Sequence, residues 1–349
     1  MGKLSIFNKA IFFVNTILAL VTLVAIIVPF VPVTTLPALS VLSLIVPLLV
    51  VVNFVFLLYW ILLKKKHLFL SGMLLLIWYF VLGPFYQFSG ASNTVNEKNG
   101  NTLTIMSFNA RSFNELKQLD IKNVDSLILD FVTDKNPDIL CFQECHYALK
   151  RNDALSQYDH KFVDFTYGKH RGKVIQAIYS KFPIVKVDSV DFPNSSNNAI
   201  FADILLNMDT IRIYNLHLQS FRIVPEINTI KSEESSKLFA KSRRVMLKQY
   251  EQANLVRENI ENTHFKKVVA GDFNNTQYSN IYQTIKGDMN DTFDEKGTGF
   301  GRTYDLLGFP IRIDYILTDP DFEVLAHQNF NEKLSDHYPV MATLRLKSE

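Results

Sequence analysis

From Ala10 to Leu63 the chain carries no charged residue, and this run of 54 residues constrains the fold more than any other feature. One membrane-spanning helix needs about 20 apolar residues, so the run is long enough for two. Pro29, Pro32 and Pro37 supply a break, because proline interrupts helices. A third apolar run follows. The sequence therefore predicts apolar helices over about Lys9–Pro29, Ala38–Leu63 and Leu68–Phe88.

A cleaved signal peptide and a buried soluble core are the alternatives for such an N-terminus. A signal peptide has one short apolar region and a small-residue cleavage site. In this chain the first run is long, lacks an obvious Ala-x-Ala site and is followed by two more apolar runs. We therefore predict a multi-pass transmembrane anchor of three helices over residues 1–88.

Basic residues set the expected orientation of these helices. Lys3 and Lys9 flank the first helix, Lys64–Lys66 join the second to the third, and the loop between the first two is uncharged. Lys and Arg concentrate in short cytoplasmic loops. We therefore predict a cytoplasmic N-terminus and an extracytoplasmic domain after about residue 90. The helices contain no Asp, Glu or Arg, which favours an anchor over an ion pathway.

The rest of the chain has the composition of a soluble domain. The first 96 residues hold five Lys and no acidic residue, so the remainder has a net charge of −3. This charge argues against a strongly basic nucleic-acid-binding body. Two cysteines, Cys141 and Cys145, are too few for a disulfide scaffold and are expected to be buried free thiols. The Gly- and Asn-rich segment 89–101 predicts a linker, which leaves 102–349 as the second domain.

Short strand-like runs separated by turns follow the linker, together with two helical stretches. The expected strands are Leu103–Phe108, Ile139–Gln143, Val174–Ser180, Ile200–Leu206, Ile211–Leu218, Lys267–Ala270, Ile311–Leu317 and Val340–Leu346. The expected helices are about Ile121–Asn136 and Ser235–Asn262. This mixture of strands and helices predicts an α/β domain.

Polar side chains collect at the ends of these strands. They are Asn109, Glu144, His217, Asp272, Asn274, Asp314, Asp336 and His337. Carboxylate and amide oxygens suit Mg²⁺ or Mn²⁺, and a His paired with an Asp transfers protons near neutral pH. A second His can donate to a phosphoryl oxygen. Gathered in one cleft, the set predicts metal-assisted cleavage of a phosphate ester.

Each of these residues also has a structural explanation when it is taken singly. Asp272 and Asn274 lie beside a glycine, as turn residues often do. Asp314 suits an ion pair with Arg312, and His217 suits a hydrogen-bonded core position. The functional interpretation therefore depends on the whole set and its order along the chain.

The order and wording of these segments resemble the endonuclease/exonuclease/phosphatase superfamily, which has the deoxyribonuclease-I-like fold. The matching segments are SFNARSFN (107–114), PDILCFQE (137–144), IYSKFPIV (178–185), IYNLHLQS (213–220), VVAGDFNNT (268–276), RIDYIL (312–317) and SDHYPV (335–340). They span nearly all of the second domain. The resemblance implies a four-layer α/β sandwich, with two packed mixed sheets covered by helices.

The resemblance also implies a divalent metal site, for Mg²⁺ or Mn²⁺. Glu144 corresponds to the main metal ligand with Asn109 beside it, and Asp336 joins or orients the site. Arg111 stands where some relatives carry a further acidic ligand. It is expected to contact substrate phosphate or to pair with a carboxylate.

The same resemblance implies the catalytic roles. Asp272 and Asn274 would position the attacking water and the scissile phosphate. His337, held by Asp314, would act as acid/base or stabilise the phosphoryl group, and His217 would donate to a phosphate oxygen. The family's Tyr or Glu that supports the first His is expected within 167–173, a segment that also offers a basic rim.

The family includes nucleases, sphingomyelinases and inositol-phosphate phosphatases, and a shared fold does not choose among them. Arg312-Ile-Asp-Tyr315 differs from the Trp-Cys-Asp-Arg type of the inositol 5-phosphatases. We therefore predict a membrane-anchored phosphodiesterase, with nucleic acid narrowly preferred as substrate. A sphingomyelinase-like phospholipid phosphodiesterase and a non-catalytic phosphate-binding module are the alternatives. The expected partners are the substrate and the membrane, and the sequence identifies no protein partner.

Overall fold

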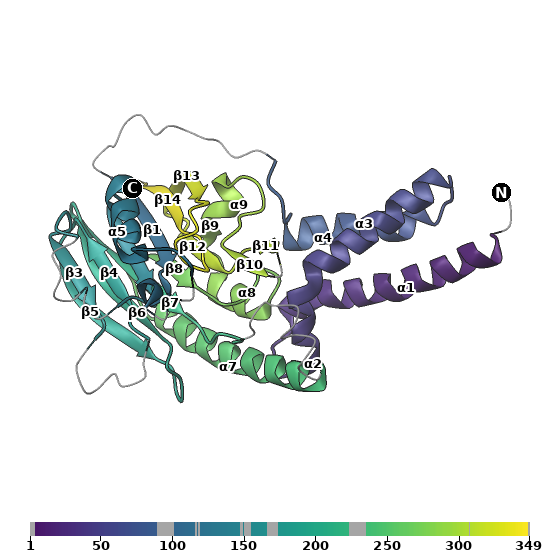
Figure 1. The fold of residues 1–349 in the computed structure, drawn as a ribbon, viewed down its shortest axis with the longest axis horizontal. Helices are drawn as coiled ribbons and strands as arrows, with labels where there is room; N and C mark the ends of the chain where they lie inside the picture. The colour runs from purple at the N-terminus through teal and green to yellow at the C-terminus, as the bar shows by residue number, and fades with distance from the viewer. Residues whose placement is uncertain are drawn as a thin grey trace.

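The computed structural model describes residues 4–88, 101–115, 117, 119–146, 149, 155–165, 174–222, 235–306 and 308–347. Figure 1 shows a group of apolar helices at the N-terminal end and an α/β domain beside them. All of the expected linker except Asn101 lies outside the described residues. So does the segment 167–173, in which a supporting residue for the first histidine was expected.

The N-terminal part contains three main apolar helices joined by short turns. They are α1 (Ile6–Ile27), α3 (Val46–Leu62) and α4 (Leu68–Leu82), with η1 (Val28–Phe30), α2 (Pro37–Ser40) and η2 (Val41–Ile45) between the first two. Two segments are long and apolar enough to cross a membrane, Ile6–Phe30 and Pro37–Leu62. Helix α4 has 15 residues and ends earlier than predicted, because Gly83 takes a positive φ of 75° and Pro84 follows it.

Buried polar side chains connect these helices. Asn15 of α1 donates to Ser71 Oγ of α4 at 2.9 Å and accepts from Trp60 Nε1 of α3 at 2.9 Å. Asn53 of α3 donates to Thr22 Oγ1 of α1 at 2.8 Å. Interhelical hydrogen bonds of this kind hold apolar helices in one arrangement where no water competes. The three helices therefore form one specific bundle.

The α/β domain contains two six-stranded mixed sheets and a short hairpin. The first sheet has the order β13 (Phe322–Asn329), β14 (Val340–Leu346), β1 (Thr102–Asn109), β2 (Ile139–Gln143), β4 (Ala177–Ser180) and β3 (His160–Val163). The second has the order β5 (Ile184–Asp191), β6 (Asn198–Leu206), β7 (Asp209–His217), β8 (Lys266–Asp272), β12 (Asp314–Thr318) and β9 (Asn290–Asp291). The hairpin pairs β10 (Tyr304–Leu306) with β11 (Phe309–Ile311).

The two sheets pack face to face and helices cover their outer faces. In β2, Ile139 and Cys141 belong to the core between the sheets, whereas Leu140 and Phe142 pack in the outer core with α5 (Val124–Lys135). This alternation follows from the two-residue period of a strand. The second sheet packs against α7 (Ser235–Glu261) and α8 (Asn280–Lys286), and α9 (Thr292–Lys296) lies beside β12 and β13. The predicted α/β sandwich of two mixed sheets is confirmed, and Cys141 and Cys145 are buried free thiols.

The central strand pairs direct several chain segments to one edge. Strands β1 and β2 are parallel, and so are β7 and β8, so each pair brings two carboxyl ends together. Strands β12 and β14 run antiparallel to β8 and β1 and therefore begin at the same edge. Asp314 pairs in register with Asp272 there.

The helical part is docked on the α/β domain through the loop after β8 and helix α8. Asn280 Nδ2 donates to Pro29 O at 2.8 Å, and Thr276 Oγ1 donates to Ser43 O at 3.2 Å. After α4, the ring of Phe85 stacks on Phe300 with centroids 6.0 Å apart. The connection between α1 and α3 and the segment after α4 therefore lie against the domain (Figure 1).

Candidate active site

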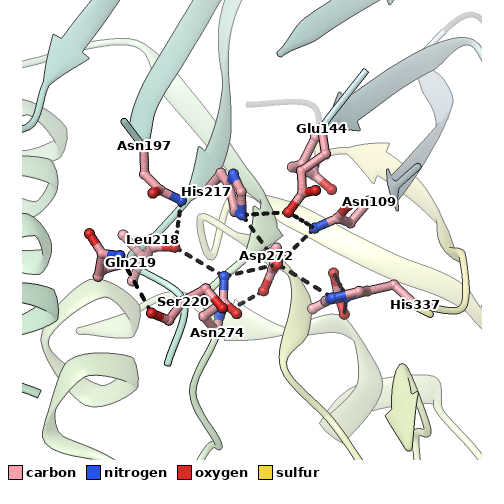
Figure 2. Close-up of polar contacts among 12 residues, drawn as sticks. Asn109, Glu144, Asn197, His217, Leu218, Gln219, Ser220, Asp272, Asn274 and His337 are labelled. Carbon is pink, nitrogen blue, oxygen red and sulfur yellow. Dashed lines mark hydrogen bonds and ion pairs between the residues drawn. The ribbon is translucent and has the colours of Figure 1, made fainter. Parts of the chain in front are cut away.

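The structure brings all nine sequence-predicted site residues to the edge where the parallel strands end. Asn109 ends β1, His217 ends β7 and Asp272 ends β8, whereas Asp314 begins β12. The others lie in the adjoining turns and are Arg111, Glu144, Asn274, Asp336 and His337. Figure 2 shows six of the nine directed toward one another around Asp272.

Asp272 lies at the centre of the group and is fully buried. Its Oδ2 accepts from Asn109 Nδ2 and from Asn274 Nδ2, both at 3.0 Å, and its Oδ1 accepts from the Asn274 amide at 2.7 Å. Burial raises the pKa of Asp272 to about 8, against the opposing effect of His337. The carboxyl group is thus held in one orientation and can accept a proton near neutral pH.

Gly271 precedes Asp272 for a steric reason. Its φ is 139°, and a Cβ at this position would lie 2.2 Å from the carbonyl oxygen of Leu216 on β7. Gly271 is paired within β8, so it permits the close approach of two parallel strands and does not form a turn. The turn follows the glycine, since the Asn274 amide donates to Asp272 Oδ1 at 2.7 Å.

His217 is buried between two carboxylates. Its Nε2 lies 3.4 Å from Glu144 Oε1 and 3.6 Å from Asp272 Oδ2. Among the described residues neither ring nitrogen has a hydrogen-bond partner of normal geometry. Burial lowers the pKa of His217, and Glu144 opposes this effect. The ring is therefore not a hydrogen-bonded core histidine, and its Nε2 is directed into the site.

His337 is held by Asp314 on the other side of the group. Its Nδ1 lies 3.0 Å from Asp314 Oδ2, and its Nε2 lies 3.7 Å from Asp272 Oδ2. Burial lowers the pKa of His337, but Asp314 and Asp272 together raise it well above its usual value. Arg312, the alternative partner of Asp314, is instead paired with Asp291. His337 and Asp314 therefore form the pair that the sequence predicted for proton transfer.

Glu144 offers carboxylate oxygens beside these histidines, and Asn109 lies next to it. Glu144 directly follows β2 and has a positive φ of 47°, which is uncommon for a residue other than glycine. Its side chain is 32% exposed. Asn109 Nδ2 contacts Glu144 Oε1 at 3.4 Å. Separately, Asp272, Asp314 and His337 place ligand atoms within 4.8 Å of one another. This set of hard oxygen donors and one imidazole fits a divalent cation.

Asp336 and Arg111 form an ion pair, with Nη1 and Oδ2 2.8 Å apart. Arg111 was expected either to contact substrate phosphate or to pair with a carboxylate, and the structure contains the second of these contacts. The backbone amide of Arg111 also donates to Asn109 Oδ1 at 3.1 Å. Arg111 therefore neutralises Asp336 and helps to orient Asn109.

Sequence reasoning missed the buried residues that position the site. Gln143 Nε2 donates to Asn215 Oδ1 at 2.6 Å, which joins β2 of one sheet to β7 of the other. Thr303 Oγ1 accepts from the Asp314 amide at 3.1 Å, and Gln249 donates to Asn274 O at 3.1 Å. Gln143 and Asn215 lie inside the segments that carried the family resemblance, and this position is the sequence feature that could have identified them.

Two family models match the chain. The one described as "Endonuclease/Exonuclease/phosphatase family" matches residues 106–337, and one described as a domain of unknown function matches residues 8–85. No curated protein matches the chain.

Many solved structures are similar to the α/β domain. D. rerio TDP2 complexed with a single-strand DNA product has a TM-score of 0.53 at 17% identity, covering 70% of this chain and 99% of that one. The human Nocturnin catalytic domain with bound sulfate has a TM-score of 0.54 at 16% identity, covering 71% and 95%. A protein of the family from Bacteroides thetaiotaomicron has a TM-score of 0.51 at 19% identity, covering 71% and 98%. At these identities the similarity establishes the fold.

Proposed function

Because the chain belongs to the endonuclease/exonuclease/phosphatase family, we propose that it hydrolyses phosphodiester bonds with a bound divalent cation. The observation that carries this proposal is the convergence of Glu144, Asp272 and His337 from three separate segments on one edge of the sandwich. A binding module would not need a buried carboxyl group whose pKa is raised next to a histidine held by its own Asp.

Glu144 and Asn109 would hold Mg²⁺ or Mn²⁺, with Asp336 beside them. When bound, the cation neutralises phosphate charge and stabilises the leaving oxygen. The pairing of Asp336 with Arg111 supports an orienting role for Asp336 in preference to direct ligation. The ion pair uses Nη1 of Arg111, and the remaining N–H donors can make the expected contact with substrate phosphate.

The chain's own residues carry the proton steps. Asp272, oriented by Asn109 and Asn274, positions the water. The water oxygen forms a bond to phosphorus while the P–O bond to one ester oxygen breaks, and that oxygen keeps the electron pair. Asp272 accepts one proton of the water, and His337 Nε2 gives one to the leaving oxygen, which yields an alcohol and a phosphomonoester. His217 Nε2 donates to a phosphoryl oxygen.

Two classes of phosphodiester fit this reaction. Nucleic acid is the class that the sequence narrowly favoured, and the similarity to D. rerio TDP2, solved with a single-strand DNA product, supports it. A membrane phospholipid is the second class, and the apolar N-terminal helices support it.

The reaction is tested with the full chain in detergent, bis-p-nitrophenyl phosphate and Mg²⁺ in ¹⁸O-labelled water. We expect p-nitrophenol and p-nitrophenyl phosphate, with one ¹⁸O atom in the phosphate product and none in the phenol. EDTA should stop turnover and excess Mg²⁺ should restore it. The absence of turnover, or label in the phenol, would show that the proposal is wrong.

We also propose that residues 1–88 are a three-helix anchor, 89–101 a linker and 102–349 the catalytic domain. One contact supports this topology. Tyr59 OH, near the end of α3, donates to Asn8 Oδ1 near the start of α1, so these two helix ends lie together, at the other end of the helices from the contacts with the domain. Helix α4 is the weakest span, since 15 residues extend for only about 22 Å.

With the N-terminus cytoplasmic, protease added outside intact spheroplasts should cleave the domain. Cleavage only after lysis would contradict this orientation.

A further inference from the structure

A residue of the N-terminal helices lines the catalytic cavity. Leu44, in η2, borders the same cavity as Glu144, Asn274 and His337. These residues come from opposite ends of the chain and from different parts of the fold. The helical part is therefore a wall of the candidate active site as well as an anchor.

The placement of Leu44 is fixed by specific contacts. The carbonyl oxygen of Ser43, its neighbour, accepts from Thr276 Oγ1 at 3.2 Å, and both of these residues are buried. Thr276 lies two residues beyond Asn274 in the loop that carries the site. Leu44 itself packs against the apolar core under α7 and α8. The end of the helix bundle and the catalytic loop are thus one packed unit.

Other apolar side chains line the cavity beside its polar residues. Phe221, Leu306, Ile311 and Ile313 line it together with Leu44, and Arg222 contributes a cation. Figure 1 shows the β10–β11 hairpin, which supplies Leu306 and Ile311, on the side of the domain that faces the helices. A groove that follows a nucleic-acid backbone would instead present several cations.

Exposed aromatic residues continue this apolar surface toward the helices. Phe309, at the tip of the hairpin, is 70% exposed, and Phe300 is 45% exposed. Phe300 contacts Phe85 and Tyr86, which directly follow α4. Exposed apolar side chains that lie next to one another are typical of a surface that contacts a partner or a membrane. With the helices in a membrane, this surface would lie beside the phospholipid head groups.

We propose that the substrate is a phospholipid of the membrane in which the helices are embedded, and this inference rests on the proposed phosphodiesterase function. The phosphodiester lies against Asp272 and His337, and the acyl chains pass Leu44 and Phe221 toward the bilayer. Withdrawing an acyl chain into water is unfavourable in proportion to the apolar surface that it exposes. A cavity wall made from the helix ends lets the phosphate reach the site while the chains stay in an apolar environment.

The test uses the full chain reconstituted in phosphatidylcholine vesicles, with three probes assayed separately. The probes are the vesicle lipid, bis-p-nitrophenyl phosphate and a single-stranded DNA oligonucleotide. We expect the wild type to cleave the lipid and the small diester with Mg²⁺. Leu44→Ser should lower lipid hydrolysis at least fivefold more than it lowers hydrolysis of the small diester. Leu306→Ser changes a lining residue of the α/β domain and should do the same, so that a folding defect in the first variant alone cannot explain the result.

Leu48→Ser is the matched control, since Leu48 lies one turn further along, is 57% exposed and does not line the cavity. It should leave the ratio of lipid to small-diester hydrolysis unchanged. Cleavage of the small diester without cleavage of the lipid would overturn this inference alone, and cleavage of DNA in its place would assign the nucleic-acid class. An equal loss on both substrates in both wall variants would also overturn it. No cleavage of any probe would instead contradict the proposed function.

Discussion

Replacement of His337 by glutamine is expected to lower kcat for bis-p-nitrophenyl phosphate by about 10³-fold, within the range found for general acid–base groups. Glutamine has a similar length but neither titrates nor carries positive charge. In the wild type, Asp314 holds Nδ1 at 3.0 Å, and Nε2 points toward Asp272, where the reacting phosphate is proposed to bind. The variant loses both the proton and the charge-assisted donor at that position.

The measurement is the initial rate at saturating substrate and Mg²⁺, for the purified full chain. His264→Gln is the matched control, because His264 lies on the exposed surface after α7. It should keep the wild-type rate. A His337→Gln enzyme that retains more than a tenth of the wild-type kcat would remove His337 from the mechanism.

Replacement of Glu144 by glutamine is expected to weaken divalent-cation binding by about 100-fold or more, since loss of even an outer hydrogen-bond partner costs 10- to 100-fold. The substitution preserves shape and removes the charge. The Glu144 side chain is partly exposed and its closest polar contacts, with His217 and Asn109, are long at 3.4 Å. The carboxylate is therefore available to a cation.

Binding is measured directly by Mn²⁺ electron paramagnetic resonance without substrate, so that turnover does not enter the result. Glu115→Gln serves as the control, because Glu115 is an exposed carboxylate in the turn after β1 and lies 3.5 Å from His146. We expect the control to bind Mn²⁺ as the wild type does. Equal affinity in Glu144→Gln would place the metal ligand elsewhere.

The central strands were predictable because they are buried on both faces. Strands β1, β2, β7 and β8 are rich in buried apolar residues, and their observed bounds differ from the predicted ones by only a few residues. Strand β5 was missed because it lies at the edge of its sheet, and its exposed Lys186 and Asp188 interrupt the apolar pattern. Strand β13, also at an edge, carries polar His327 and Gln328 near its end.

The site residues were predictable for a related reason. Parallel strands send their carboxyl ends to one edge, so polar residues that follow buried strands converge there.

The second apolar helix was predicted as continuous, but the structure has the 3-10 turn η2 and then α3, with Pro47 in the first turn of α3. Proline is favoured at that position because its missing N–H needs no partner there.

Contacts between distant segments could not be obtained from the sequence pattern. The bond from Gln143 to Asn215 depends on how two sheets are stacked, and neither residue shows this in its own segment. The same holds for Leu44, which as an apolar residue in an apolar run gave no indication that it lines the cavity of the candidate site. Periodicity reports the face that a residue occupies, but it does not report what lies opposite that face.

The rate of phosphodiester hydrolysis as a function of free Mg²⁺ tests the central claim most directly. The full chain, stripped with EDTA and dialysed, is titrated with Mg²⁺ at fixed bis-p-nitrophenyl phosphate. The site described here predicts a rate that rises from background and saturates as one class of cation site fills. A rate that is already maximal in EDTA, or that stays at background at every Mg²⁺ concentration, would contradict a metal-dependent phosphodiesterase.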